Sequence, residues 1–150
     1  MMGEELEKLA VVSALLLAAK EMGLEMRHYL PVEEVARIYN GVGPEWMGEE
    51  QRAKADKLSQ TLLPAVMIHD VDFEYGTGTM LDFQLANRRL EANGRKCADY
   101  RYGWYNPMRY IVRHQAKVYA KLCDLLGFPA YAAAVEERKQ YNHETETKEA

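Results

Sequence analysis

The amino-acid sequence predicts an all-α fold. Its apolar residues recur at intervals of three and four positions through most of the chain, which is the spacing of one helix face. No segment sustains the alternation of apolar and polar residues that indicates a half-buried strand. With 150 residues, 48% of them hydrophobic, the chain can bury one core. We therefore expect a compact single domain over residues 1–141 and a disordered tail over 142–150, where the run 143–149 has no apolar residue.

Two helices are expected in the first forty residues. The first runs from about Glu4 to Met22 and stops near Gly23, because glycine readily takes the left-handed conformation that ends a helix. The second opens with Pro31, whose fixed φ suits the first helical position. Its apolar residues are Val32, Val35, Ala36 and Ile38.

An antiparallel helical hairpin forms the centre of the predicted fold. A polar helix over about 49–60 leads into it. The first helix of the hairpin spans about 62–75, with Thr61 as its cap. After a glycine-containing turn, Thr79 caps the second helix, which spans about 79–93 and ends at Gly94.

The C-terminal part contains a long helix over about 107–126. Asn106 is expected to cap it, and Pro107 stands at its first position. Gly127 ends it, and a last helix follows over about 129–140.

Composition excludes several classes of function. A formal net charge of −4 argues against nucleic-acid binding, because proteins that bind phosphate backbones non-specifically carry a large basic surplus. Cys97 and Cys123 lack CxxC spacing, so neither a disulfide framework nor a zinc site is predicted. The apolar stretch 9–19 is too short to span a bilayer and follows acidic residues, unlike a signal peptide. We expect a cytoplasmic protein without a transmembrane segment.

The dipeptide His69-Asp70 is the most informative functional feature. It follows the apolar run 62–68, so an imidazole and a carboxylate are expected in a buried helix. A buried carboxylate has to be paired, bound to a metal or neutralised. The segment 39–44, Tyr-Asn-Gly-Val-Gly-Pro, can approach closely and turn its carbonyl oxygens inward, as calcium requires. We expect this loop to fold over residues 69 and 70.

This combination resembles the phospholipase A2 superfamily, in which a Y-x-G-x-G calcium loop precedes an H-D-x-x-Y helix and an antiparallel helix supplies an aspartate. The resemblance covers about residues 39–93. It implies that His69 is the general base that activates water against a phospholipid ester, while calcium stabilises the oxyanion. The implied calcium ligands are Asp70 and the backbone carbonyls of Tyr39, Gly41 and Gly43. The chain also resembles small proteins of tailed phages and prophages.

Three features depart from the phospholipase pattern. Phe73 stands four residues after His69, where the pattern has tyrosine. Pairing the two central helices brings Asn87 to the place of the aspartate that orients the histidine. Asparagine can accept a hydrogen bond from the imidazole but cannot balance an imidazolium ion. The interval between the glycine loop and the H-D helix is also longer than in the family. The catalytic network is therefore expected to be incomplete.

Structural interpretations of the same residues stay open. His69 can be a core histidine with one ring nitrogen bonded to an oxygen and no catalytic role. Asp70 can pair with Arg88, Arg89 or an arginine of the loop. Two further acids of this helix are expected to be solvated: Asp72 and Glu74.

Three segments are candidates for contact with partners. Helix 107–126 has a basic row, predicted as a solvated face or as a surface for an anionic partner. Tyrosines over 100–110 either pack on the core or form a recognition patch. Trp46 and Met47 either fill a core gap or anchor at a lipid interface. The basic row consists of Arg109, Arg113, Lys117 and Lys121, opposite Ile111, Val118, Leu122 and Leu125.

Two functions remain. The first is calcium-dependent hydrolysis of phospholipid esters, with His69 as base and Asn87 as the residue that orients it. The second is a non-catalytic virion or assembly protein, located in the cytoplasm of the producing cell or in the virion, that uses the same helical scaffold to bind other phage proteins.

Overall fold

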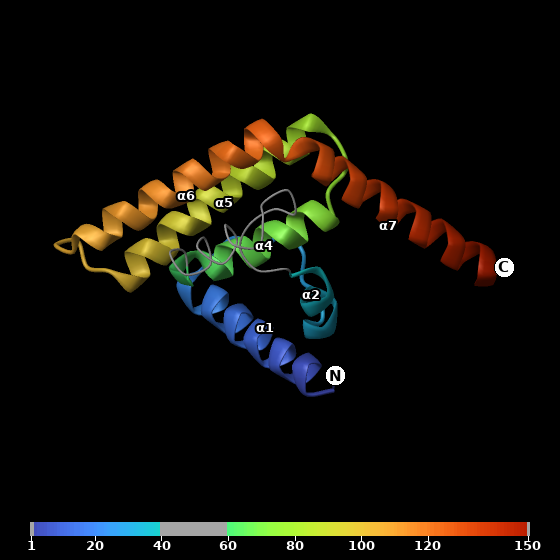
Figure 1. The fold of residues 1–150 in the computed structure, drawn as a ribbon, viewed down its shortest axis with the longest axis horizontal. Coiled ribbons are helices and arrows are strands. Elements are labelled where there is room, and N and C mark those ends of the chain that lie inside the picture. The colour runs from blue at the N-terminus through green and yellow to red at the C-terminus, as the bar shows by residue number, and fades with distance from the viewer. Residues whose placement is uncertain (1, 40–59, 150) are drawn as a thin grey trace.

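A computed structural model describes residues 2–39 and 60–149 and confirms the all-α fold, since these ranges contain six α-helices and one short 3-10 helix and no strand. Figure 1 shows their arrangement. In chain order they are α1 (Met2–Met22), α2 (Val32–Ile38), η1 (Gln60–Leu62), α4 (Leu63–Glu74), α5 (Met80–Arg101), α6 (Pro107–Leu126) and α7 (Phe128–Glu149).

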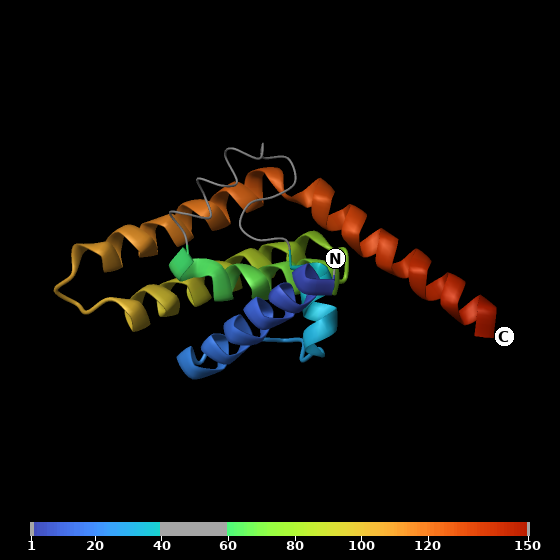
Figure 2. The ribbon, with the colours of Figure 1, turned by 60° about the horizontal axis from the view of Figure 1, so that its bottom comes forward.

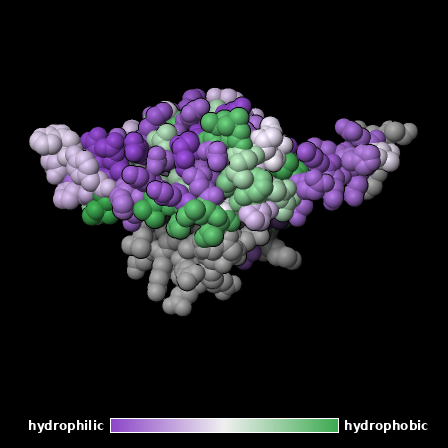
Figure 3. Space-filling view, turned by 90° about the horizontal axis from the view of Figure 1, so that it is seen from above, coloured by the Kyte–Doolittle hydropathy of each residue, from purple (hydrophilic) through white to green (hydrophobic). Residues whose placement is uncertain are grey.

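Three helices form the central layer. α4 and α5 make the predicted antiparallel hairpin, and α6 runs back along α5 (Figure 1). α1 and α2 pack against the other side of α4. α7 turns away at the end of α6 and extends beyond the rest of the described chain (Figure 2). The surface seen from above is mostly hydrophilic, with scattered apolar patches (Figure 3).

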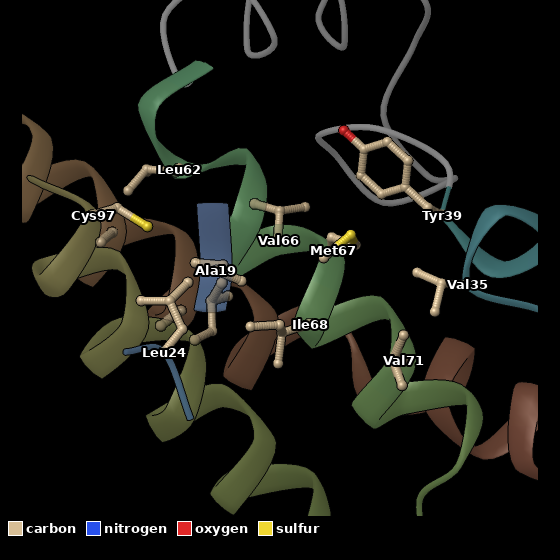
Figure 4. Packing of buried hydrophobic residues seen from close by; sticks show 14 of the residues in the cluster. Ala19, Leu24, Val35, Tyr39, Leu62, Val66, Met67, Ile68, Val71 and Cys97 are labelled. Carbon is tan, nitrogen blue, oxygen red and sulfur yellow. The ribbon is translucent and has the colours of Figure 1, made fainter. Parts of the chain in front are cut away.

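The main hydrophobic core surrounds α4. This helix is apolar on most of its circumference, as expected of a helix buried between neighbours. Figure 4 shows its side chains between those of α1, α2 and α5. Its most deeply buried apolar residues are Ala65, Val66, Met67, Ile68 and Val71.

A second, aromatic cluster joins α7 to the hairpin. Tyr131 is fully buried against Phe83 and Phe73. Its hydroxyl donates to Asp82 and accepts from the backbone N–H of Gly78, 2.9 Å away in each case. A Cβ at Gly76 would come within 2.4 Å of the Tyr131 ring, so the turn of the hairpin depends on glycine there.

Most predicted helix ends are confirmed. Gly23 has a φ of 67° and follows α1. Thr79 accepts a hydrogen bond from the backbone N–H of Asp82, and Asn106 accepts one from that of Met108. These caps satisfy backbone donors that the first turn of a helix leaves free.

Three boundaries were predicted wrongly. Thr61 does not cap α4, because a 3-10 turn precedes the helix and Leu62 already has helical torsion angles. Gly94 does not end α5, which continues to Arg101. α7 does not end near Gln140 but continues to Glu149, so the structure has helix over most of the tail predicted to be disordered.

Two further observations concern the sequence predictions. The polar helix expected over about 49–60, together with Trp46 and Met47, lies outside the described residues except for Gln60. Among the described helices, none alone is long and apolar enough to cross a membrane, and α6 with α7 meet that criterion only as a pair bent by 71°.

Candidate functional site around His69

His69 lies in the middle of α4 and faces α5. It is buried, and its Nε2 atom is 2.7 Å from Oδ1 of Asn87. The predicted placement of Asn87 opposite His69 is therefore confirmed, and Asn87 is fully buried. Phe73, one helical turn after His69, packs on the imidazole with ring centroids 4.2 Å apart. The site therefore adjoins the aromatic cluster around Tyr131.

The hydrogen-bond chain continues from α5 to α6. Nδ2 of Asn87 donates to Oδ1 of Asp124 at 2.7 Å, and Arg88 pairs with the other carboxylate oxygen. Because the Asn87 amide nitrogen faces a carboxylate, its oxygen faces His69 and acts as an acceptor. Nε2 of His69 therefore carries the hydrogen and donates. The chain connects three helices through side chains alone.

The surroundings keep His69 neutral. Its pKa is lowered to about 4, mainly by burial and also by the nearby Arg89 guanidinium, while the bond to Asn87 and the charge of Asp124 act in the opposite direction. Desolvation wins because it penalises the imidazolium ion directly, whereas the Asp124 charge acts across an intervening amide. At neutral pH His69 is thus a weak base.

Asp72 is buried, so the prediction that it is solvated was wrong. Its carboxylate accepts a hydrogen bond from Arg89 at 2.7 Å, and both side chains are at least nine-tenths buried. A second acid, Glu25, lies 3.6 Å from Arg89. Burial raises the pKa of Asp72, although the Arg89 bond opposes that rise. Arg89, one of the alternative partners considered for Asp70, links α4 to α5 through Asp72.

The expected calcium ligands are only partly described. Tyr39 is buried and belongs to the same core cluster as Met67 of α4; both are labelled in Figure 4. Asp70 is partly exposed on α4. Gly41 and Gly43 lie outside the described residues. In the part of the chain that the structure describes, no group of three or more His, Cys, Asp or Glu side chains could hold a metal ion.

This donor set does not establish a calcium site. Calcium in proteins takes about six to eight oxygen ligands. The described chain supplies one carboxylate of the expected set and the residue at the start of the loop. The calcium-binding roles of Asp70, Tyr39, Gly41 and Gly43 therefore stay predictions.

Asp124 is the residue of this site that the sequence did not reveal. It stands near the end of a helix whose other charged residues are basic, so one available signal was that it would pair with a basic residue. A second signal was the amide of Asn87, because a buried amide nitrogen requires an acceptor. Neither signal predicts that Asn87 and Asp124 pair with each other, because the sequence does not give the geometry of the turn between α5 and α6 and so does not fix their register.

Comparison with known proteins adds no assignment. No family model, curated protein or solved structure matches this chain.

Proposed function

We propose that this chain is a non-catalytic interaction protein, in which the His69 chain of hydrogen bonds holds the scaffold together and α6 presents the binding surface. The observation that carries the proposal is the burial of His69 between Phe73 and Asn87. In the phage context that the resemblance implies, the partner would be another virion or assembly protein.

The properties of His69 support a structural role. A general base works best when its pKa lies near the working pH. The pKa of His69, about 4, lies well below neutral pH. Its orienting partner is an amide, which gives no direct charge to an imidazolium ion. A satisfied polar chain in a core fixes the relative positions of the elements it joins. Here those elements are α4, α5 and α6.

The surface of α6 supports a binding role. Apolar side chains at 41% to 75% exposure lie along this helix, including Leu122 and Leu125. Exposed apolar surface of this extent commonly marks an interaction site.

Hydrolysis of phospholipid esters is the second candidate, and Asp124 is the observation that favours it. Its carboxylate orients Asn87, so a negative charge reaches the imidazole through one amide. In that case the Asp124 carboxylate would supply the negative charge that the phospholipase pattern places next to the histidine, with the Asn87 amide between it and His69.

Exchanging the two side chains distinguishes these candidates. Asn87→Asp combined with Asp124→Asn moves the carboxylate next to the imidazole and keeps a donor for it on α6. Asn87→Asp alone is unsuitable, because it places two carboxylates together and removes the amide donor. We expect no release of fatty acid from phospholipid micelles at millimolar calcium, either from the unmodified chain or from the double variant.

Release of fatty acid would contradict the proposal. Calcium-dependent release by the unmodified chain, raised at least about tenfold in the double variant and lost in His69→Ala, would overturn the non-catalytic proposal. Circular dichroism of each variant controls for folding. Lys139→Glu, on the exposed part of α7, is the matched control for a change of charge away from the site.

A further inference from the structure

One face of α6 carries a regular row of exposed apolar residues, interrupted at its centre by the partly buried Gln115. Its members are separated alternately by three and four residues, which is the spacing of a helix–helix seam. Each apolar member is more than two-fifths exposed. The row is Met108, Ile111, Gln115, Val118, Leu122 and Leu125.

The row is distinct from the face that α6 turns to α5. The buried residues of α6 are Val112, Ala116, Ala120 and Cys123. At about 100° per residue, this buried stripe and the exposed row lie on adjacent sides of the helix. α6 is therefore apolar on two sides, one of which already packs on α5.

Positive charge borders the exposed row. His114 and Lys121 are exposed and border the row on the side that faces away from the buried stripe, and Lys117 is exposed one step farther round the helix. Asp124, the nearby acid, is already bonded to Asn87 and Arg88. A partner that covers the row therefore meets lysines at its edge.

We infer that this row binds an acidic amphipathic helix of a partner protein. The inference rests on the proposed function and names the chemistry of the partner. The row supplies apolar contacts at seam spacing, and Lys121 on its flank, with the positive charge of Lys117 farther round the helix, selects glutamate or aspartate on the flank of the bound helix.

The same residues disfavour two other occupants. A second copy packed antiparallel along the row would set lysines against lysines, because matching flanks meet in that arrangement. A lipid surface would have to accept Gln115 in the centre of the apolar row. The Gln115 carboxamide oxygen is buried and has no hydrogen-bond partner among the described residues, so a side chain of a bound helix that donates a hydrogen bond would satisfy it.

A pair of designed peptides tests the inference. Each has about three heptads with leucine at the seam positions, and they differ only in having glutamate or lysine at the flanking positions. We expect the full chain to bind the glutamate peptide, measured by fluorescence anisotropy, at least about tenfold more tightly than the lysine peptide. Leu122→Glu and the more exposed Leu125→Glu should each weaken binding about tenfold or more.

Charge reversal provides the matched test. Lys117→Glu combined with Lys121→Glu should reverse the preference in favour of the lysine peptide, whereas Lys139→Glu on α7 should leave it unchanged. Equal binding of both peptides, or no binding, overturns the inference. So does concentration-dependent dimerisation that Leu125→Glu abolishes, or binding to phosphatidylglycerol vesicles that is tighter than binding to the glutamate peptide.

The peptide-binding and ester-hydrolysis experiments distinguish a wrong partner chemistry from a wrong proposed function. If the peptides do not bind and no ester is hydrolysed, only the partner chemistry is wrong. If ester hydrolysis depends on His69, the proposed function is wrong whatever the peptides do.

Discussion

At the scale of single residues, two buried polar pairs connect the two helices of the hairpin. His69 donates to Asn87, and Asp72 pairs with Arg89, so α4 and α5 are joined at two heights. Buried polar groups cost free energy unless their hydrogen bonds are made, and each of these four side chains makes at least one, although Nε of Arg89 makes none among the described residues. They specify one alignment of the two helices, because a shift by one residue would leave all four side chains without partners.

The lowered pKa of His69 makes stability depend on pH. The neutral imidazole is favoured in the folded chain, so the unfolded chain binds the extra proton between the ordinary pKa of 6.5 and the folded value of about 4. Stability is complete above pH 6.5 and falls as the pH drops toward 4. The expected loss is about 3 kcal/mol, from 1.36 kcal/mol per pKa unit.

Urea unfolding at pH 7, 5.5 and 4 measures this loss. Because Asp72 and other acids titrate in the same range, the informative quantity is the difference between the unmodified chain and His69→Gln. This difference should shrink as the pH falls from 7 to 4. A difference that stays constant over that range would contradict the buried, neutral histidine.

At the scale of helices, the closeness of α5 and α6 depends on small residues. A Cβ at Gly94 would lie 2.5 Å from that of Ala116. Real Cβ atoms do not approach so closely, so the two helices can meet here only because position 94 has no side chain. The glycine that signalled a helix end in the sequence serves helix packing instead.

Gly94→Ala should therefore destabilise the chain. Alanine favours a helix over glycine by about 1 kcal/mol, yet forcing α5 and α6 apart should cost more, for a net loss of about 1–2 kcal/mol. Thermal unfolding measures the change. Adding Ala116→Gly restores the space and should recover part of the loss, and an increase in stability from Gly94→Ala alone would show that the contact is not tight.

At the scale of the whole molecule, α7 is divided between an anchored and an exposed part. Phe128, Tyr131 and Val135 pack on the hairpin, and Arg138 donates to the carbonyl oxygen of Gly76. Residues 139–147 are all exposed. Within this exposed part, Thr145 and Thr147 bond to carbonyls one turn earlier.

Hydrogen exchange should show this division. Helices without an apolar face gain little stability from packing, so amides over 139–147 should exchange fastest among the described helices. Amides of α5 between Phe83 and Ala98 should exchange slowest, because both of its sides are covered. Mass spectrometry after a short pulse in deuterated water measures both. Equal protection of the two segments would mean that the end of α7 is covered in solution.

The sequence by itself determined the helical class and most helix ends. Three- and four-residue spacing, the caps Thr79 and Asn106 and the glycine after α1 act locally, so neighbouring residues are sufficient to predict them. The placement of Asn87 against His69 was also predictable, because a short turn fixes the register of an antiparallel pair.

The tertiary structure alone decided the roles of Gly94, Asp72 and Asp124. Each depends on a residue of another helix: Ala116, Arg89 and Asn87 respectively. Whether a glycine ends a helix, or an aspartate lies in solvent, is set by what packs against it. That is a property of distant contacts, which local spacing in the chain does not encode.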